Sequence, residues 1–152
     1  MKKLIVIAEK EEIGLVNRLE LKGIPILVTG VGALNVIEAL REVPKDTEII
    51  NIGYAGSKNL SVGKFYMVNY STLYHPNVNY PEQIYKLGDC SMIWCYTVSD
   101  FVTDTDKEDC LFDMELAYIM ALGFENVTSY KYVSDNTNIE EYRNTNGNGQ
   151  DL

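Results

Sequence analysis

Residues 3–52 read KLIVIAEKEEIGLVNRLELKGIPILVTGVGALNVIEALREVPKDTEIINI, and they alternate the signals of strands and helices. A short continuous apolar run is typical of a strand buried on both faces, whereas apolar residues three or four positions apart indicate a helix. The predicted strands are Lys3–Ala8, Ile24–Val28 and Glu48–Ile52, and the predicted helices are Glu11–Lys22 and Ala33–Val43. Strand–helix–strand units of this length predict an α/β fold with a mainly parallel sheet.

The second half of the chain is less regular. Residues 71–88 are rich in Tyr, Asn and Pro and show no helical pattern, and the chain becomes rich in Asn and Gly from Asn136. The predicted elements are strands at Phe65–Tyr70, Ser91–Val98 and Val127–Val133 and a helix at Cys110–Leu122. We therefore expect one α/β domain over residues 1–135, followed by a polar tail over residues 136–152 that is frayed or disordered.

Composition narrows the class of protein. The 152 residues suit one domain, and 46% apolar with 23% charged residues is close to the globular average. The formal charge of −9 argues against duplex nucleic acid or an anionic membrane as partner. The apolar run Leu4–Ala8 is too short for a signal-peptide core, and no run approaches transmembrane length. The cysteines have no metal-ligand spacing, so we expect no metal site and reduced thiols in a cytoplasmic protein: Cys90, Cys95 and Cys110.

Polar residues follow the predicted strands at the points where they end. In an open α/β sheet, ligands bind beyond the carboxyl ends of the strands, so these segments are candidate binding loops. They are residues 9–12, 29–32, 53–56, 99–102 and 134–136, and Asp113-Met114-Glu115 stands at the start of the last predicted helix. The sequence therefore predicts two glycine-rich turns, an aromatic residue and several carboxylates along one edge of the sheet.

Each of these segments also has a plain structural interpretation. Gly30 and Gly32 lack the third glycine of a dinucleotide-binding turn, because Asn35 stands in its place. Asn51 likewise replaces the carboxylate that would bind a ribose in such a site. A tight turn therefore explains the glycines better than a nicotinamide site does. The glutamates within residues 9–12 are typical of a helix start. Asp113 and Glu115 are also typical of a helix start, and Asp135 of a turn or a helix cap.

Taken together, the segments resemble the nucleoside phosphorylase superfamily, and within it the methylthioadenosine/S-adenosylhomocysteine nucleosidases. The resemblance runs in the family's order from residue 3 to about residue 136, through KLIVIAEKEEI, VTGVGALNVIEAL, IINIGYAGSKNLSVG, SDFV, FDMELAYIMA and YKYVSDN. It implies a three-layer fold, in which a mainly parallel mixed sheet is flanked by helices. The fold is trimmed, because the family's helix before SDFV and its long C-terminal helix have no counterpart here.

The resemblance implies hydrolysis of the N-glycosidic bond of an adenosine-like ribonucleoside, without a cofactor. Cleavage develops positive charge on the sugar and negative charge on the base, so it needs an acid, a base for water and a carboxylate facing the sugar. By position in the motifs, Asp135 is the acid, Glu12 the general base and Glu115 the ribose-binding carboxylate. The other implied contacts are Ser134 beside the acid, Met114 at the ribose, Phe101 stacked on the base, the backbone of Val102 at the base edge, and Ala55 and Gly56 beneath the sugar.

Two residues depart from the family's pattern within these motifs. Tyr54 stands where the family has a small residue, which predicts a narrowed or rebuilt sugar or water pocket. Lys131 stands where an arginine is common, which keeps the charge but loses the planar fork. These departures and the trimmed length leave the identity of the base and of the 5′ substituent open.

Three other functions compete with hydrolysis. They are a purine- or nucleoside-binding protein of the same fold without turnover, a phosphorylase, and a purely structural α/β domain. The presence of both an acid and a water-activating base favours turnover. A phosphorylase needs fixed positive charge beside the glycine turns, whereas Glu9–Glu12 holds three acids and one lysine. We therefore expect a nucleosidase, with a nucleoside as its small-molecule partner.

We also expect a homodimer, which the resemblance implies. The missing helices leave surface that a single copy must cover in another way. The tyrosine-rich stretch Phe65–Tyr85 is the candidate for pairing with a second copy, because aromatic residues are favoured in the cores of interfaces.

Overall fold

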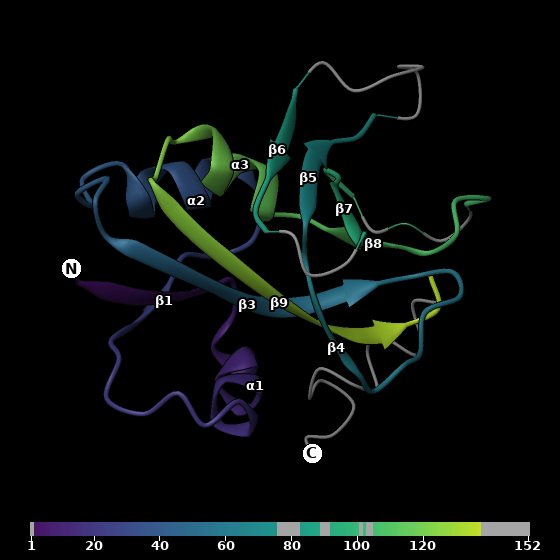
Figure 1. Cartoon of the computed structure of the whole chain (residues 1–152), viewed down its shortest axis with the longest axis horizontal. Coiled ribbons are helices and arrows are strands. Elements are labelled where there is room, and N and C mark those ends of the chain that lie inside the picture. The colour runs from purple at the N-terminus through teal and green to yellow at the C-terminus, as the bar shows by residue number, and fades with distance from the viewer. Residues whose placement is uncertain (1, 76–82, 89–91, 101, 103–104, 138–152) are drawn as a thin grey trace.

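The computed structural model describes residues 2–75, 83–88, 92–100, 102 and 105–137. Within them, the strands form one curved mixed sheet, and helices cover both of its faces (Figure 1). The strands are β1 (Lys3–Ile7), β2 (Ile26–Val28), β3 (Glu48–Gly56), β4 (Phe65–Met67), β5 (Tyr70–Leu73), β6 (Ile84–Lys86), β7 (Trp94–Thr97), β8 (Cys110–Asp113) and β9 (Asn126–Asp135). The helices are the 3₁₀ turn η1 (Lys10–Glu12), α1 (Ile13–Arg18), α2 (Ala33–Leu40) and α3 (Leu116–Ala121).

The sheet has nine strands and branches at β3. Its main path runs β2-β1-β3-β8-β7-β5-β6, and β9 pairs with both β3 and β4. The pairs β1–β2, β1–β3, β3–β9, β5–β7 and β7–β8 are parallel, whereas β3–β8, β4–β9 and β5–β6 are antiparallel. The predicted mainly parallel mixed sheet is therefore confirmed.

The helices form the two outer layers of a three-layer arrangement, as predicted. Strand side chains alternate between the faces of a sheet, so neighbouring residues of β1 pack against different helices. Ile5 and Ile7 pack in one cluster with Leu15 and Val16 of α1. Val6 packs in another with residues from α2 and α3, namely Val36, Leu40 and Ile119. Figure 1 shows α1 on one side of the sheet and α2 with α3 on the other.

The predicted helix at Cys110–Leu122 is wrong in its first third. Cys110–Asp113 form strand β8, which pairs in parallel with β7, and helix α3 begins only at Leu116. All four residues of β8 are buried, because the strand is covered on both faces. A short apolar run buried on both faces carries no alternation, so the sequence pattern does not distinguish it from a buried helix.

The predicted strands at Glu48–Ile52 and Val127–Val133 are too short. β3 continues through residues 53–56, which had been expected to form a glycine-rich turn, because β9 stays paired with β3 up to Asp135. The register shifts between Ala55 and Gly56, which marks a β-bulge at the end of the pair. The residues expected in loops at this edge therefore lie on strands.

Smaller differences concern the middle of the chain. The strand predicted at Phe65–Tyr70 divides into β4 and β5, and the segment over residues 71–88, which showed no pattern, contributes most of β5 and all of β6. Cys95 and Cys110 are unbridged buried thiols, whereas Cys90 lies outside the described residues. The tail predicted over residues 136–152 lies outside them from residue 138 onward. No helix in the described ranges is long and apolar enough to cross a membrane.

Candidate active site

A cavity of about 260 Å³ opens at the carboxyl ends of β1, β3 and β9. This volume is near the lower end of the roughly 300–1,000 Å³ range of small-molecule sites. It is lined by Ala8, Glu9, Glu12, Val31, Tyr54, Ala55, Gly56, Val98, Asp100, Val102, Phe112, Asp113, Met114, Glu115, Ser134 and Asp135. The structure thus brings together the residues predicted for the site, except Phe101, which lies outside the described residues.

Glu12 is a buried carboxylate held by backbone amides. The N–H groups of Ala8 and Glu9 donate to its Oε1 at 2.8 and 3.0 Å, and the N–H of Tyr54 donates to its Oε2 at 2.9 Å. Only 4% of the residue is exposed, and this burial raises the pKa of Glu12 above its ordinary value, although the amides and the nearby Lys131 oppose the rise. A carboxylate with a raised pKa and a fixed orientation is suited to accept a proton from water.

Gly53 explains how Glu12 fits against the sheet. A Cβ atom on Gly53 would lie 2.9 Å from Glu12 Oε2 and 3.4 Å from Lys131 Nζ. The glycine is therefore required by the close approach of these two side chains, and not by a turn.

Asp135 is the last residue of β9 and is fully buried. The Ser134 hydroxyl donates to Asp135 Oδ1 at 2.7 Å. Asp135 Oδ2 lies 3.1 Å from the point where a Cβ on Gly56 would stand, so this glycine makes room for the acid. Asp135 and Ser134 therefore face the cavity from the end of a paired strand, where the backbone is held in place.

Glu115 lies directly before α3 and 9% of it is exposed. Its Oε2 accepts a hydrogen bond from the N–H of Gly32 at 3.3 Å, which joins the late helix to the glycine turn after β2. Burial and the adjacent Asp113 raise the pKa of Glu115 to about 8. The glycine turn itself has Gly30 and Gly32 at φ +93° and +90°, in agreement with the predicted tight turn.

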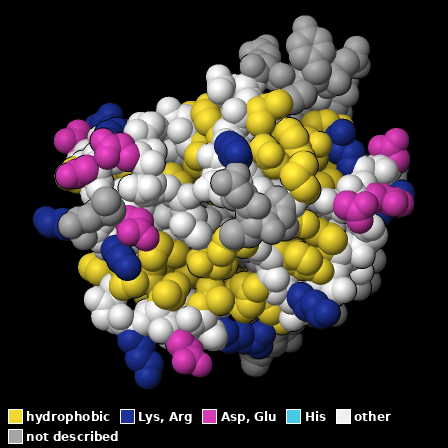
Figure 2. Space-filling view, in the orientation of Figure 1, with side chains coloured by type: hydrophobic (Ala, Val, Ile, Leu, Met, Phe, Trp, Pro, Cys, Tyr) yellow, Lys and Arg dark blue, Asp and Glu magenta, His cyan; other side chains and the backbone are white. Residues whose placement is uncertain are grey.

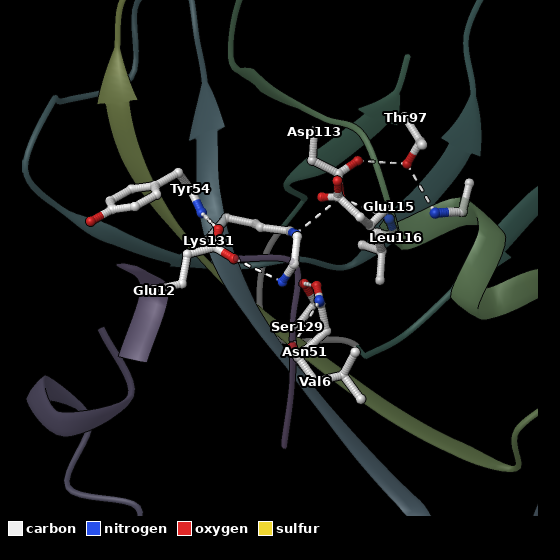
Figure 3. A network of polar contacts seen from close by, with 12 residues as sticks. Val6, Glu12, Asn51, Tyr54, Thr97, Asp113, Glu115, Leu116, Ser129 and Lys131 are labelled. Carbon is white, nitrogen blue, oxygen red and sulfur yellow. Dashed lines mark hydrogen bonds and ion pairs between the residues drawn. The ribbon is translucent and has the colours of Figure 1, made fainter. Parts of the chain in front are cut away.

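Asp113 and Lys131 form a buried ion pair at the floor of the site. Lys131 Nζ lies 3.0 Å from Asp113 Oδ2, and both side chains are almost completely buried (Figure 3). Burial alone would raise the pKa of Asp113, but Lys131, the Thr97 hydroxyl and the N–H of Leu116 together hold it below its ordinary value. The pKa of Lys131 is raised by Asp113 despite its burial, so the pair stays charged.

Tyr54 does not fill the space between the carboxylates. Its ring packs edge-on against Tyr132, with ring centroids 6.0 Å apart, and in Figure 3 it points away from Asp113 and Glu115. Tyr132 in turn packs against Phe65 and accepts a hydrogen bond from Arg18 at 2.9 Å. Tyr54 therefore lines the cavity without its ring reaching toward Asp113 and Glu115.

The cavity is lined by both acidic and apolar side chains. Its acidic lining residues are Glu9, Glu12, Asp100, Asp113, Glu115 and Asp135, and its apolar ones include Val98, Val102, Phe112 and Met114. No lysine or arginine is among the described residues that line it. Such a lining suits a neutral ligand with an apolar ring and several hydroxyl groups, and disfavours an anion.

Sequence reasoning did not assign roles to several lining residues. Phe112 was placed in a helix, and Asp113 was noted only as a helix-start acid, although it stands within the FDMEL motif. Thr97 gave no signal, because a threonine in a buried strand is ordinary. No group of three His, Cys, Asp or Glu within the described segments is arranged to hold a metal ion.

The branched sheet and its two helix layers make up an α/β fold that is also found in solved structures of methylthioadenosine/S-adenosylhomocysteine nucleosidases. One of them is the nucleosidase of Chlamydia trachomatis (MTAN) bound to methylthioadenosine (MTA). It is 19% identical, with a TM-score of 0.74, over 96% of this chain and 90% of that one.

Two streptococcal structures are similar to the same degree. The S-adenosylhomocysteine nucleosidase of Streptococcus pyogenes is 17% identical, with a TM-score of 0.73, over 96% of this chain and 90% of that one. The MTA/SAH nucleosidase of Streptococcus pneumoniae is 17% identical, with a TM-score of 0.72, over 98% and 91%. At these identities the likeness establishes the fold. No family model matches the sequence, and a search of curated proteins finds no relative.

Proposed function

We propose that the protein hydrolyses the N-glycosidic bond of an adenosine-like ribonucleoside, of the 5′-methylthioadenosine or S-adenosylhomocysteine type. One observation carries the proposal: Asp135, Glu12 and Glu115, brought from β9, η1 and the start of α3, line a single cavity. The ligands of the similar structures agree in kind. They are MTA in the Chlamydia trachomatis protein, 5-methylthiotubericidin in the Streptococcus pyogenes protein and 8-aminoadenine in the Streptococcus pneumoniae protein.

In this proposal Asp135 protonates the leaving purine and Glu12 activates water. Protonation of the base removes the negative charge that develops as the bond breaks, and the Ser134 hydroxyl holds the carboxyl of Asp135 in place. Glu12 is oriented by three backbone amides, so one of its oxygens can take the proton of a water that attacks the sugar carbon. Glu115 binds the ribose hydroxyls, with Met114 beside it.

The remaining lining residues hold the substrate. Val102 presents its backbone to the edge of the base. The stacking of Phe101 on the base is carried over from the sequence resemblance, because Phe101 lies outside the described residues. Ala55 and Gly56 lie beneath the sugar, at the bulge that ends β3. Tyr54 lines the same cavity, and its N–H holds Glu12.

The acidic lining favours hydrolysis over phosphorolysis. A phosphate dianion placed beside Glu12 would be repelled, and no lysine or arginine among the described lining residues would offset the repulsion. Lys131 is engaged with Asp113 below the cavity. Water beside Glu12 meets no such barrier.

The test is to incubate the purified protein with a panel of nucleosides in phosphate-free buffer and to separate the products by chromatography. We expect release of free purine and free ribose sugar, most rapidly from 5′-thio-substituted adenosines. Strict dependence on phosphate, with a sugar 1-phosphate as product, would show a phosphorylase instead. Binding of nucleosides without release of base would show a binding protein of the same fold.

We further propose that the protein works in the cytoplasm as a homodimer. The buried thiols of Cys95 and Cys110 are unbridged, which suits a reducing compartment. On the face shown in Figure 2, apolar side chains form broad patches, and most of the charged side chains lie toward the rim. Exposed apolar surface of this kind is typical of an interaction site.

A further inference from the structure

Thr97 of β7, Asp113 of β8 and Lys131 of β9 form a network of polar contacts at the first turn of α3 (Figure 3). The Thr97 hydroxyl donates to Asp113 Oδ1 at 2.6 Å and accepts from the N–H of Ala117 at 2.9 Å. Asp113 Oδ2 accepts from the N–H of Leu116 at 2.8 Å and from Lys131 Nζ at 3.0 Å. Two of the helix's initial N–H groups are thus satisfied by side chains of the sheet.

This network surrounds Glu115 without including it. Glu115 lies between Asp113 and Leu116, and its backbone, at φ −134° and ψ −37°, is neither extended nor helical. The residues on both sides of it are therefore fixed to the sheet, while its own carboxylate reaches across to the N–H of Gly32. The direction in which Glu115 points depends on where α3 begins.

We propose that Thr97 and Asp113 are positioning residues that aim Glu115 at the ribose, and that Lys131 keeps Asp113 in the form that can do so. The inference rests on the proposed role of Glu115. Asp113 accepts hydrogen bonds from three groups, an arrangement that favours the ionised carboxylate, and Lys131 supplies the charge that stabilises it in a buried place. Thr97 both donates to Asp113 and accepts from α3, so its hydroxyl joins the strand to the helix.

The prediction concerns selectivity for the 2′-hydroxyl. If Glu115 binds the ribose hydroxyls, kcat/KM for a ribonucleoside exceeds that for its 2′-deoxy counterpart. Thr97→Val keeps the shape of the side chain and removes the hydroxyl. We expect it to lower this ribo/deoxy ratio about tenfold, since a displaced Glu115 loses its hydrogen bond to the 2′-hydroxyl and one hydrogen bond contributes up to about that factor. Asp113→Asn is expected to lower the ratio similarly, and Thr97→Ser to restore it.

Ser129→Ala is the matched control. Ser129 is also a fully buried hydroxyl residue of the sheet, and it donates to Asn51 Oδ1 at 2.8 Å, away from α3. We expect it to lower the melting temperature without changing the ribo/deoxy ratio. If the substitutions acted only by destabilising the fold, the ribo/deoxy ratio would change in all the variants. An unchanged ratio in Thr97→Val, or an equal loss in Ser129→Ala, would overturn the positioning role.

Two further measurements separate this inference from the proposed function. If Thr97→Val does not fold, Asp113→Asn is read in the same way, and an unchanged ratio there overturns the inference. If the wild-type protein binds nucleosides but releases no base, the proposed hydrolysis fails, and the ratio of dissociation constants for the two sugars tests the positioning role. A wild-type protein that does not discriminate between ribose and 2′-deoxyribose at all refutes the inference, whatever its turnover.

Discussion

At the scale of single residues, the buried carboxylates of the cavity differ in what stabilises each of them. Glu12 is stabilised by backbone amides, and Asp113 by the ammonium group of Lys131. Glu115 has a single backbone donor and a pKa of about 8, so it carries its proton over much of the neutral range. Carboxyl groups whose environments differ in this way can take different roles within one site.

The roles of Asp135 and Glu12 predict the effect of removing either charge. Asp135→Asn and Glu12→Gln are each expected to slow base release about 10²–10⁴-fold, the usual scale of acid–base catalysis. Glu11→Gln is the matched control, because Glu11 is an exposed neighbour of Glu12. The measurements are kcat and KM by base release, with thermal melting to show that each variant is folded. Unchanged turnover in Asp135→Asn or in Glu12→Gln removes that residue from the mechanism.

The raised pKa of Glu115 predicts a dependence of stability on pH. Folded Glu115 keeps its proton up to about pH 8, whereas the unfolded chain loses it near the ordinary value of 4.5. Between these values the folded state binds more protons, so stability falls as pH rises, by about 1.4 kcal/mol per pH unit at most. Glu115→Gln has no proton to lose. Its melting temperature relative to wild type should therefore increase from pH 5 to pH 8 and then level off, and a difference that is constant with pH would contradict the assignment.

At the scale of elements, the extension of β3 through Gly53 is what allows Glu12 and Lys131 to lie against the sheet. In Gly53→Ala the new methyl group, 2.9 Å from Glu12 Oε2, must displace that oxygen and weaken its bond to the N–H of Tyr54. We expect base release to fall about 10–100-fold, because small displacements of catalytic groups are costly. Gly14→Ala is the control, since nothing lies within 4 Å of the new atom there. Equal activity in the two variants would show that the position of Glu12 does not matter.

How far the elements could be predicted depends on how clearly each one shows its period. α2 was predicted because its apolar residues recur at helical spacing, and β1 because its run is apolar throughout and ends at charged residues. β8 was not predicted, because its mainly apolar run CLFD is followed closely by the apolar residues of α3, and the two together look like one helix. The strand residues Gly53–Gly56 were taken for a turn because glycine usually marks one, whereas here the glycines make room for side chains of other elements.

The site residues could be predicted because they stand in recognisable motifs. The residues that hold them in place stand in no such motif and could not be predicted. Asp135 and Glu12 stand in segments with a recognisable order, so they could be named from the sequence. The contacts of Thr97 with Asp113 and α3 join residues 16 and 20 positions apart, and the Asn51–Ser129 bond joins residues 78 positions apart. Contacts of this kind follow from strand register, which a single sequence does not specify.

At the scale of the whole molecule, the exposed apolar residues indicate where a second copy would dock. Leu34 and Ile37 lie three residues apart in α2 and are 76% and 40% exposed, and Val31, in the turn just before the helix, is 38% exposed. Residues at this spacing lie along one side of a helix. Val31 also lines the cavity, so a copy docked here would reach the mouth of the site. The alternative surface is the stretch Phe65–Tyr85, which exposes Leu73 and Ile84 in its described part.

These surfaces predict opposite results for two matched substitutions. We expect the wild-type protein to be a dimer by light scattering at concentrations of about 10 µM, a range in which stable homodimers persist. Leu34→Glu places a charge on the exposed side of α2 and should give a folded monomer, because an unpaired charge in an interface is strongly unfavourable. Leu73→Glu makes the same change at an exposed leucine on β5, 49% exposed, and should leave the dimer intact. Dissociation by Leu73→Glu alone would move the interface to the tyrosine-rich stretch, and a fully active wild-type monomer would rule out the dimer.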